Sequence, residues 1–199
     1  MESTYFTPRL VLQRVVPADA TDIFEAYAHD PRVAKYMRWK PHQSVADSEA
    51  FVKMLEKEKK RKGGHQAWAI RLRETSQLIG LVGLDVFPPK VHLGYVLGHP
   101  WWGNGYVSEA VKTMIDAAFQ LPAVFRVEGI CEASHEASGR VMTKGGMSYE
   151  GLLRSHTVLP NISEAPSDMR MYAIVRDDWE TLKKGDMKVS TNPSPARST

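Results

Sequence analysis

The chain has 199 residues, of which 43% are hydrophobic and 25% are charged, so it is long enough for one domain with a buried core. Its formal net charge of +3 is too small for the concentrated positive field that non-specific binding to nucleic acid requires, and no run of apolar residues is long enough to predict a membrane span. The one cysteine, Cys131, excludes an internal disulfide and a thiolate metal cluster, which favours a reducing cytoplasmic location and a small buried apolar role for this side chain.

The first elements predicted along the chain are a strand and two helices. The N-terminal sequence MESTYFTPRLVLQRV lacks the continuous apolar segment of a secretory signal, and the alternation of apolar and polar residues at 9–15 predicts a half-buried strand. Apolar spacing over 17–27 predicts a helix, and a second helix begins at Ser44, where Asp47 stands in the glutamate place of a capping box. Two glycines at 63 and 64 are expected to end this second helix after a charged, solvated last turn.

A meander and a helix come next. Three strands are predicted at 68–72, 78–87 and 91–97, and the short links between them imply antiparallel pairing. Over 107–118 the apolar residues recur at helical spacing, which predicts a helix with one face packed on the sheet.

The last predicted elements are a strand at 126–131, a helix at 136–144 and two strands at 149–158 and 169–175. The strand, helix, strand order predicts parallel pairing beside the meander, so we expect a mixed sheet in an α/β (α+β) fold. Residues 185–199 are rich in Ser, Thr, Pro and Asn and are expected to form a flexible tail after a single domain at 1–184.

One stretch, HPWWGNGYVSEA at 99–110, places two tryptophans beside a Gly-Asn-Gly turn that opens a predicted helix. Because a helix N-terminus carries unpaired N–H groups and a partial positive charge, it attracts anions, and Gly103 and Gly105 allow the backbone to approach them. An ordinary tight turn is the alternative interpretation. The stretch lacks the Gly-Lys-Ser/Thr of a P-loop, and Ser108 stands where a dinucleotide motif needs its third glycine.

The order of these motifs resembles the GNAT N-acetyltransferases, and more narrowly their RimJ/RimL-type branch (ribosomal-protein alanine acetyltransferase-like). The resemblance covers 6–180 and rests on TPRLVLQRVVPADA, LGYVLGHPWWGNGYVSEA and ASGRVMTKGGMSYEGLLR, with Asp168, Tyr172 and Trp179 near its end. It implies a GNAT fold, with a mixed, mostly antiparallel sheet of six to seven strands flanked by about four helices. The sheet is expected to splay between the fourth and fifth predicted strands.

The resemblance implies transfer of an acetyl group from acetyl-CoA to a primary amine, by direct attack in a ternary complex without a metal. It places the CoA diphosphate on the glycine turn, although Pro100 stands at the first place of the family's pattern. Trp101 and Trp102 would anchor that turn or wall the groove, and one of them is expected to pack in the core. The cofactor-binding residues that it implies are Val96 or Leu97 as the backbone oxyanion donor, with Trp102, Gly103, Asn104, Gly105, Tyr106, Val107, Ser108, His135 and Ser138.

Three side chains are candidates for the chemistry. His92 stands where the branch usually has glutamate, and an imidazole with an ordinary pKa of about 6.5 can accept the amine proton through a water; a satisfied strand histidine is the alternative. Glu109 is the second candidate base, or a favourable acidic residue in a helix first turn. Ser138 matches the serine of the family's Asn-x-x-Ser segment and would protonate the CoA thiolate, or only cap its helix; His135 replaces the asparagine of that segment.

For the acceptor pocket, the resemblance points to the first helix pair, its loop and the last two strands, and the candidate residues there are Tyr36, Trp39, Trp68 and His156. Nothing in the sequence chooses between a small-molecule amine and a protein N-terminus. The alternative function is an acetyl-CoA-binding module impaired in catalysis by its two histidine departures; a nucleic-acid-binding or structural domain using the basic run at 57–62 ranks below it. The expected partners are acetyl-CoA and an amine acceptor, without nucleic acid or membrane, for a monomer or homodimer.

Overall fold

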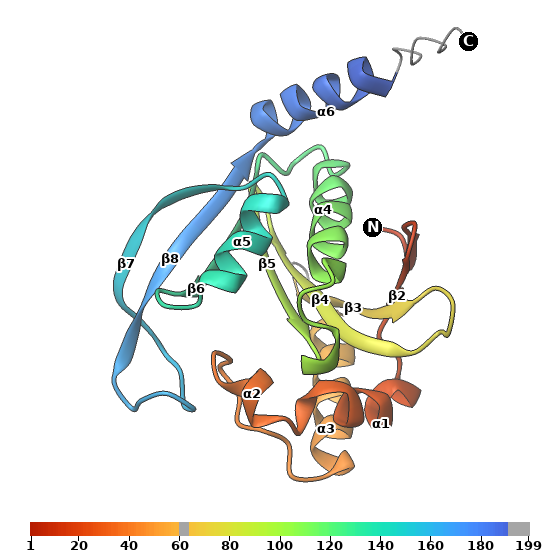
Figure 1. Cartoon of the computed structure of the whole chain (residues 1–199), viewed down its shortest axis with the longest axis vertical. Coiled ribbons are helices and arrows are strands. Elements are labelled where there is room, and N and C mark those ends of the chain that lie inside the picture. Colours follow the sequence, from red (N-terminus) through yellow and green to blue (C-terminus); the bar gives the residue numbers. More distant parts are fainter. Residues whose placement is uncertain (60–63, 191–199) are drawn as a thin grey trace, which may run out of the picture.

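A computed structural model describes residues 1–59 and 64–190, and within these the fold is one mixed sheet of eight strands with helices on both faces (Figure 1). The strand order is β1-β2-β3-β4-β5-β6-β8-β7. The strands are β1 (Thr4–Phe6), β2 (Leu10–Arg14), β3 (His65–Leu72), β4 (Leu78–Phe87), β5 (Lys90–Leu97), β6 (Arg126–Glu132), β7 (Ser148–Val158) and β8 (Pro166–Val175). The α-helices are α1 (Ala20–Ile23), α2 (Pro31–Ala34), α3 (Val45–Lys59), α4 (Tyr106–Phe119), α5 (Glu136–Lys144) and α6 (Arg176–Ser190).

The sheet confirms the predicted fold class and its mixed pairing. Neighbouring strands are antiparallel throughout except for β5 and β6, which are parallel and are joined by the crossover helix α4. The strand beyond the predicted six to seven is β1, which pairs with β2. Its three residues are too few to show an alternating pattern, which is why the sequence did not reveal it.

The helical elements differ from the prediction at both ends of the chain. The helix expected over 17–27 is divided into a 3-10 turn, α1 and a π-helical turn at Phe24–Ala28, and α2 follows it. At the C-terminus α6 continues to Ser190, beyond the domain boundary predicted at 184, because its polar sequence gave no signal for burial. Residues 191–199 of the predicted tail lie outside the described residues.

Helix α3 begins as its sequence indicates. The carboxylate of Asp47 accepts hydrogen bonds from the N–H groups of Gln43 (2.8 Å) and Ser44 (3.1 Å), so the acidic half of the predicted capping box is formed. The predicted stop at Gly63 and residues 60–62 of the basic run at 57–62 fall in 60–63, outside the described residues. Among the helices that the structure describes, none is long and apolar enough to cross a membrane.

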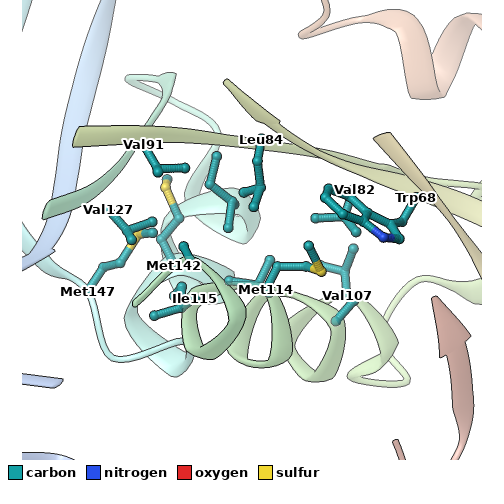
Figure 2. Packing of buried hydrophobic residues seen from close by; sticks show 14 of the residues in the cluster. Trp68, Val82, Leu84, Val91, Val107, Met114, Ile115, Val127, Met142 and Met147 are labelled. Atoms are coloured by element: carbon teal, nitrogen blue, oxygen red, sulfur yellow. The ribbon is translucent and has the colours of Figure 1, made fainter. Parts of the chain in front are cut away.

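Two hydrophobic clusters cover the two faces of the sheet. One cluster packs α4 and α5 on the sheet, and Figure 2 shows Met114 and Ile115 of α4 facing Val82 and Leu84 of β4. The other cluster packs α1, α2 and α3 on the opposite face. Side chains of a strand alternate between faces, so Leu93 of β5 joins the first cluster and the even-numbered residues of β5 face α1–α3.

Trp68 of β3 is the largest completely buried side chain on the α4 face, with 0% exposure. Its indole Nε1–H donates to the carbonyl of Glu2 (3.3 Å), and the Arg14 guanidinium stacks 3.7 Å from the ring centre. We predict that Trp68→Ala lowers the free energy of unfolding by about 3–5 kcal/mol, because it leaves a cavity beneath α4. Denaturant unfolding followed by circular dichroism measures this loss, and Trp68→Phe should lose less than half as much; an unchanged midpoint for Trp68→Ala would contradict this packing.

Candidate functional site

The parallel strands β5 and β6 separate after a short paired segment. Pairing is confined to Lys90–His92 against Arg126–Glu128, while β5 continues to Leu97 and β6 to Glu132. The two strands therefore part beyond this segment, and we call the place where they separate the opening. β5 and β6 correspond to the fourth and fifth strands predicted from the sequence, because β1 was not among the predicted strands. The predicted splay is therefore confirmed.

Alternation along β5 determines which of its N–H groups face this opening. The N–H of Gly98 donates to β4 (2.9 Å), so the even-numbered residues before it, including Val96, direct their N–H groups toward β4. The carbonyl of Leu93 lies 3.1 Å from where a Cβ on Gly129 of β6 would stand. The odd-numbered residues of β5 therefore direct their backbone N–H and C=O groups toward β6. Of the two candidate oxyanion donors, Leu97 therefore directs its N–H toward the opening, and Val96 does not.

The glycine turn lies directly after β5 and opens α4. Gly103 and Gly105 have φ values of +80° and +78°, in the left-handed region that favours glycine, and a Cβ on Gly103 would meet no atom within 4 Å. The first backbone hydrogen bond of α4 runs from Glu109 N–H to Gly105 O (3.2 Å). The N–H groups of 106–108 come before it and have no helical partner, so the turn presents donors and the positive end of the helix to an open surface.

Other groups of the turn hold its shape. The Asn104 side-chain amide donates to the carbonyls of Trp101 (3.2 Å) and Trp102 (3.1 Å), which closes the turn on itself. Trp101 packs against the α4 core, as expected for one of the two tryptophans, and lies over Gly98, where a Cβ would approach its ring to 2.5 Å. Trp102 is 46% exposed, and its Nε1–H donates to the carbonyl of Leu97 (2.8 Å). The exposed indole forms a wall beside the opening.

Glu109 braces the turn from below. The Glu109 carboxylate accepts hydrogen bonds from Thr7 Oγ1 (2.5 Å) and from the Nε (2.8 Å) and backbone N–H (3.1 Å) of Arg9. The Arg9 side chain also reaches the turn: its Nη1 donates to the carbonyl of Asn104 (3.0 Å), and its guanidinium covers the Tyr106 ring. Burial acts to raise the pKa of Glu109, but these hydrogen bonds hold it below its ordinary value. The carboxylate is thus a fully engaged anion, which argues against its predicted role as a base. Arg9, about a hundred positions away in sequence, is a residue that the sequence analysis missed.

Ser138, in the first turn of α5, meets Tyr95 of β5. The phenol oxygen lies 2.7 Å from Ser138 Oγ, and the phenol donates to the carbonyl of Ser138 (2.9 Å). Burial raises the pKa of Tyr95, so the phenol is protonated throughout the physiological range. Cys131 is buried, as predicted, and burial also raises the pKa of its thiol. Tyr95 was not among the sequence candidates, although it is the tyrosine of the Gly-Tyr pair that the family resemblance uses.

The structure brings together two candidates that the sequence assigned to different ligands. The rings of Tyr36, after α2, and His135, before α5, stack with centroids 4.1 Å apart and an interplanar angle of 13°. Burial lowers the pKa of His135, so its imidazole is neutral at pH 7. The contact joins the expected acceptor side to the expected cofactor side of the opening.

The remaining acceptor candidates lie in three different environments. Trp39 packs against the α1–α3 cluster, and its carbonyl accepts from the Asn161 amide (2.7 Å), which ties the loop after α2 to the β7–β8 hairpin. His156 is exposed on β7 with its Nδ1 2.8 Å from Thr157 Oγ1. Trp68 lies in the core on the α4 face, away from α1–α3, and its complete burial removes it from the acceptor candidates.

His92 of β5 faces α1–α3 at the point where β5 and β6 begin to part. Burial lowers the pKa of its imidazole, against the opposing effect of the carboxylates of Asp85 and Glu128, so the ring is neutral at pH 7. Two positions further, on the same face, a Cβ on Gly94 would meet no atom within 4 Å. This face of β5 is therefore open two positions beyond His92. Within 1–59 and 64–190, no group of three or more His, Cys, Asp or Glu is placed to hold a metal ion.

Comparison with known proteins agrees with this geometry. A family model for the acetyltransferase (GNAT) domain matches residues 9–148. The uncharacterized N-acetyltransferase p20 of Bacillus licheniformis is 31% identical over 156 residues, covering 77% of this chain and 86% of the relative.

Two solved structures share the fold. A GNAT-family acetyltransferase from Bacillus anthracis has a TM-score of 0.74 at 24% identity, covering 87% of this chain and 99% of that one. RimL, a ribosomal L7/L12 α-N-protein acetyltransferase solved in complex with coenzyme A, has a TM-score of 0.76 at 17% identity. The match covers 86% of this chain and 97% of the RimL chain. The family match and the Bacillus licheniformis relative together show that this chain belongs to the GNAT acetyltransferase family.

Proposed function

We propose that this chain transfers the acetyl group of acetyl-CoA to a primary amine by direct attack in a ternary complex. The observation that carries the proposal is the open glycine turn at the N-terminus of α4, next to the splay of β5 and β6. The family uses acetyl-CoA, and the RimL neighbour was solved with coenzyme A. We place this chain in the RimJ/RimL-type branch on its Gly-Tyr and WGNGYVSEA motifs, and in the cytoplasm on its free thiol.

The turn fits a diphosphate. The N–H groups at 103–108 and the positive helix end would receive its negative charge, and the absence of a side chain at Gly103 leaves the approach open. Arg9, half-exposed and paired with Glu109, donates to the carbonyl of Asn104 and so holds the turn in the shape that a diphosphate would need. His135, at the start of α5, would hydrogen-bond the pantetheine arm, as the family resemblance implies. Bound acetyl-CoA supplies the thioester carbonyl that an amine attacks.

The reaction creates negative charge first on the carbonyl oxygen and then on the CoA sulfur, and groups of β5 and α5 would stabilise both. The N–H of Leu97 faces the opening and would stabilise the oxyanion of the attacked carbonyl. Ser138 Oγ–H would protonate the departing thiolate and regain its proton from solvent, while the Tyr95 phenol, 2.7 Å from that oxygen, holds the hydroxyl in place.

On the opposite face, His92 would accept the proton of the attacking amine through a water. Its imidazole is neutral at pH 7, as a base requires, and the open position at Gly94, two residues along the same face, would admit an amine near it. Tyr36, Trp39 and the β7–β8 hairpin that carries His156 surround this side and would contact the rest of the acceptor, whether a small molecule or a protein N-terminus.

The proposal is tested by release of free CoA thiol from acetyl-CoA over a panel of primary amines and N-terminal peptides. We expect turnover with at least one acceptor, and a Kd for CoA at least tenfold higher in Gly103→Val, because a β-branched residue at φ +80° distorts the turn. Gly146→Val is the matched control, since Gly146 has φ +95° at the end of α5, away from the turn. CoA binding without turnover on any acceptor would indicate an impaired binding module, and equal affinity in wild type and Gly103→Val would refute the diphosphate site.

Ser138→Ala separates chemistry from binding. Because the hydroxyl is proposed to act on the leaving thiolate, we expect kcat to fall about tenfold to a hundredfold while the Kd for CoA changes by less than about threefold. Thr143→Ala is a matched control on the same helix, where the threonine hydroxyl only donates to the carbonyl of Gly139. Steady-state kinetics and calorimetric titration measure the two quantities; equal losses in both would reduce Ser138 to a cofactor-positioning residue.

Gly94→Val fills the space beside His92. The φ angle of Gly94 is not in the left-handed region and valine suits a strand, so the variant should fold. We expect kcat/KM for the amine to fall at least tenfold, with the Kd for CoA unchanged and an intermediate loss in Gly94→Ala. An amine kcat/KM equal to that of the wild type in Gly94→Val would show that the acceptor binds elsewhere.

A further inference from the structure

A row of polar side chains crosses four strands on the face covered by α1–α3. Successive members of the row stand directly opposite one another in the strand register, and all of them lie on the face that carries the α1–α3 cluster. In order from β3 to β6 they are His65, Asp85, His92 and Glu128. The proposed base is therefore one member of a larger arrangement.

The first pair of the row is held firmly. Nδ1–H of His65 donates to Oδ1 of Asp85 (2.7 Å), and both side chains are about two-thirds buried. The imidazole lies over β4 at Gly83, where a Cβ would approach its Cε1 to 2.5 Å and its Nε2 to 2.7 Å. Only a glycine at this position leaves room for the ring, so the strand sequence itself accommodates the His65–Asp85 pair.

The two carboxylates beside His92 differ in how they are neutralised. Glu128 accepts from Lys90 Nζ (2.8 Å) and from Arg126 Nε (2.7 Å), so two cations hold its negative charge. Asp85 accepts a hydrogen bond from His65. This bond, together with nearby positive charges, keeps the pKa of the Asp85 carboxyl below its ordinary value, against the opposing effect of burial. Among the described residues, no hydrogen bond to the His92 ring is found, and Asp85 is the residue directly opposite it on β4.

We propose that Asp85, fixed by His65, is a positioning residue for His92 in the acetyl transfer. The inference rests on the proposed function. In the step, the amine nitrogen forms a bond to the acetyl carbon and the carbon–sulfur bond breaks. The thiolate takes its proton from Ser138, which regains one from solvent, and the amine proton passes to His92 and then to solvent. Asp85 orients the imidazole and stabilises the imidazolium that forms for the duration of the step.

The charges around His92 give this role a distinctive pH signature. Asp85 on β4 and Glu128 on β6 favour the protonated ring, whereas burial, Lys90 and Arg38 oppose it. A base must be deprotonated to work, so the acid limb of kcat/KM should lie below pH 6.5 in the wild type. Removal of the negative charge at Asp85 lowers the pKa of His92 further, and the acid limb then moves to a still lower pH.

The test compares pH profiles of acetyl transfer. For Asp85→Asn we expect the acid limb to move down by about half a pH unit or more and kcat to fall about tenfold, with KM for acetyl-CoA unchanged. Asp85→Glu keeps the charge and should keep the limb, and His65→Gln should give a smaller loss of kcat. Asp116→Asn is the control: that carboxylate also holds an ion pair, with Lys183 (2.6 Å), but on α4, away from the row.

NMR titration of the His92 ring gives a readout that does not depend on activity. The ring should titrate at a lower pH in Asp85→Asn than in the wild type and at the wild-type value in Asp116→Asn. If the wild type transfers acetyl but Asp85→Asn has the wild-type limb and the wild-type His92 titration, the positioning role is overturned. If the wild type transfers acetyl to no amine, the proposed function itself fails. If Asp85→Asn does not fold, His65→Gln serves in its place, and a wild-type kcat in His65→Gln would then overturn the positioning role.

Discussion

The separation of β5 from β6 is the constraint on which the rest of the site depends. Three paired positions at Lys90–His92 keep the two strands in one sheet, and beyond them each strand carries backbone polar groups with no partner across the gap. Unpaired backbone groups are costly when buried, so a protein retains such an opening only where something else engages them. We propose that a ligand engages the N–H of Leu97 here, while alternation along β5 puts Tyr95 on the α4 face and His92 on the α1–α3 face.

The groups around the opening are fixed before any ligand arrives. Arg9 and Glu109 tie the N-terminal segment to the first turn of α4, the Asn104 amide closes the glycine turn, and Ser138 is bonded to Tyr95 from the other side. Donors that are already oriented need little reorganisation when charge develops, which is where most electrostatic stabilisation of a transition state arises. Glu109 is one of these fixed groups, and its engaged carboxylate acts as a structural anion and not as a base.

Local patterns in the sequence predicted most of the fold and the position of the glycine turn. Alternation at 9–15 and helical spacing at 107–118 survive in the structure because burial of one face imposes them. Contacts between distant segments were not predictable, since a pattern does not show which side chains meet: Arg9 with Glu109, Tyr36 with His135, and the row from His65 to Glu128. Trp68 failed as an acceptor candidate for this reason, because the sequence did not reveal which face of β3 its side chain occupies.

A crystal structure of the chain with coenzyme A tests the central claim most directly. The account predicts that the diphosphate accepts hydrogen bonds from the N–H groups between 103 and 108, with the pantetheine arm between β5 and β6 and the sulfur within hydrogen-bonding distance of Ser138 Oγ. A diphosphate bound away from that turn, or an arm that does not enter the gap between the two strands, would contradict it.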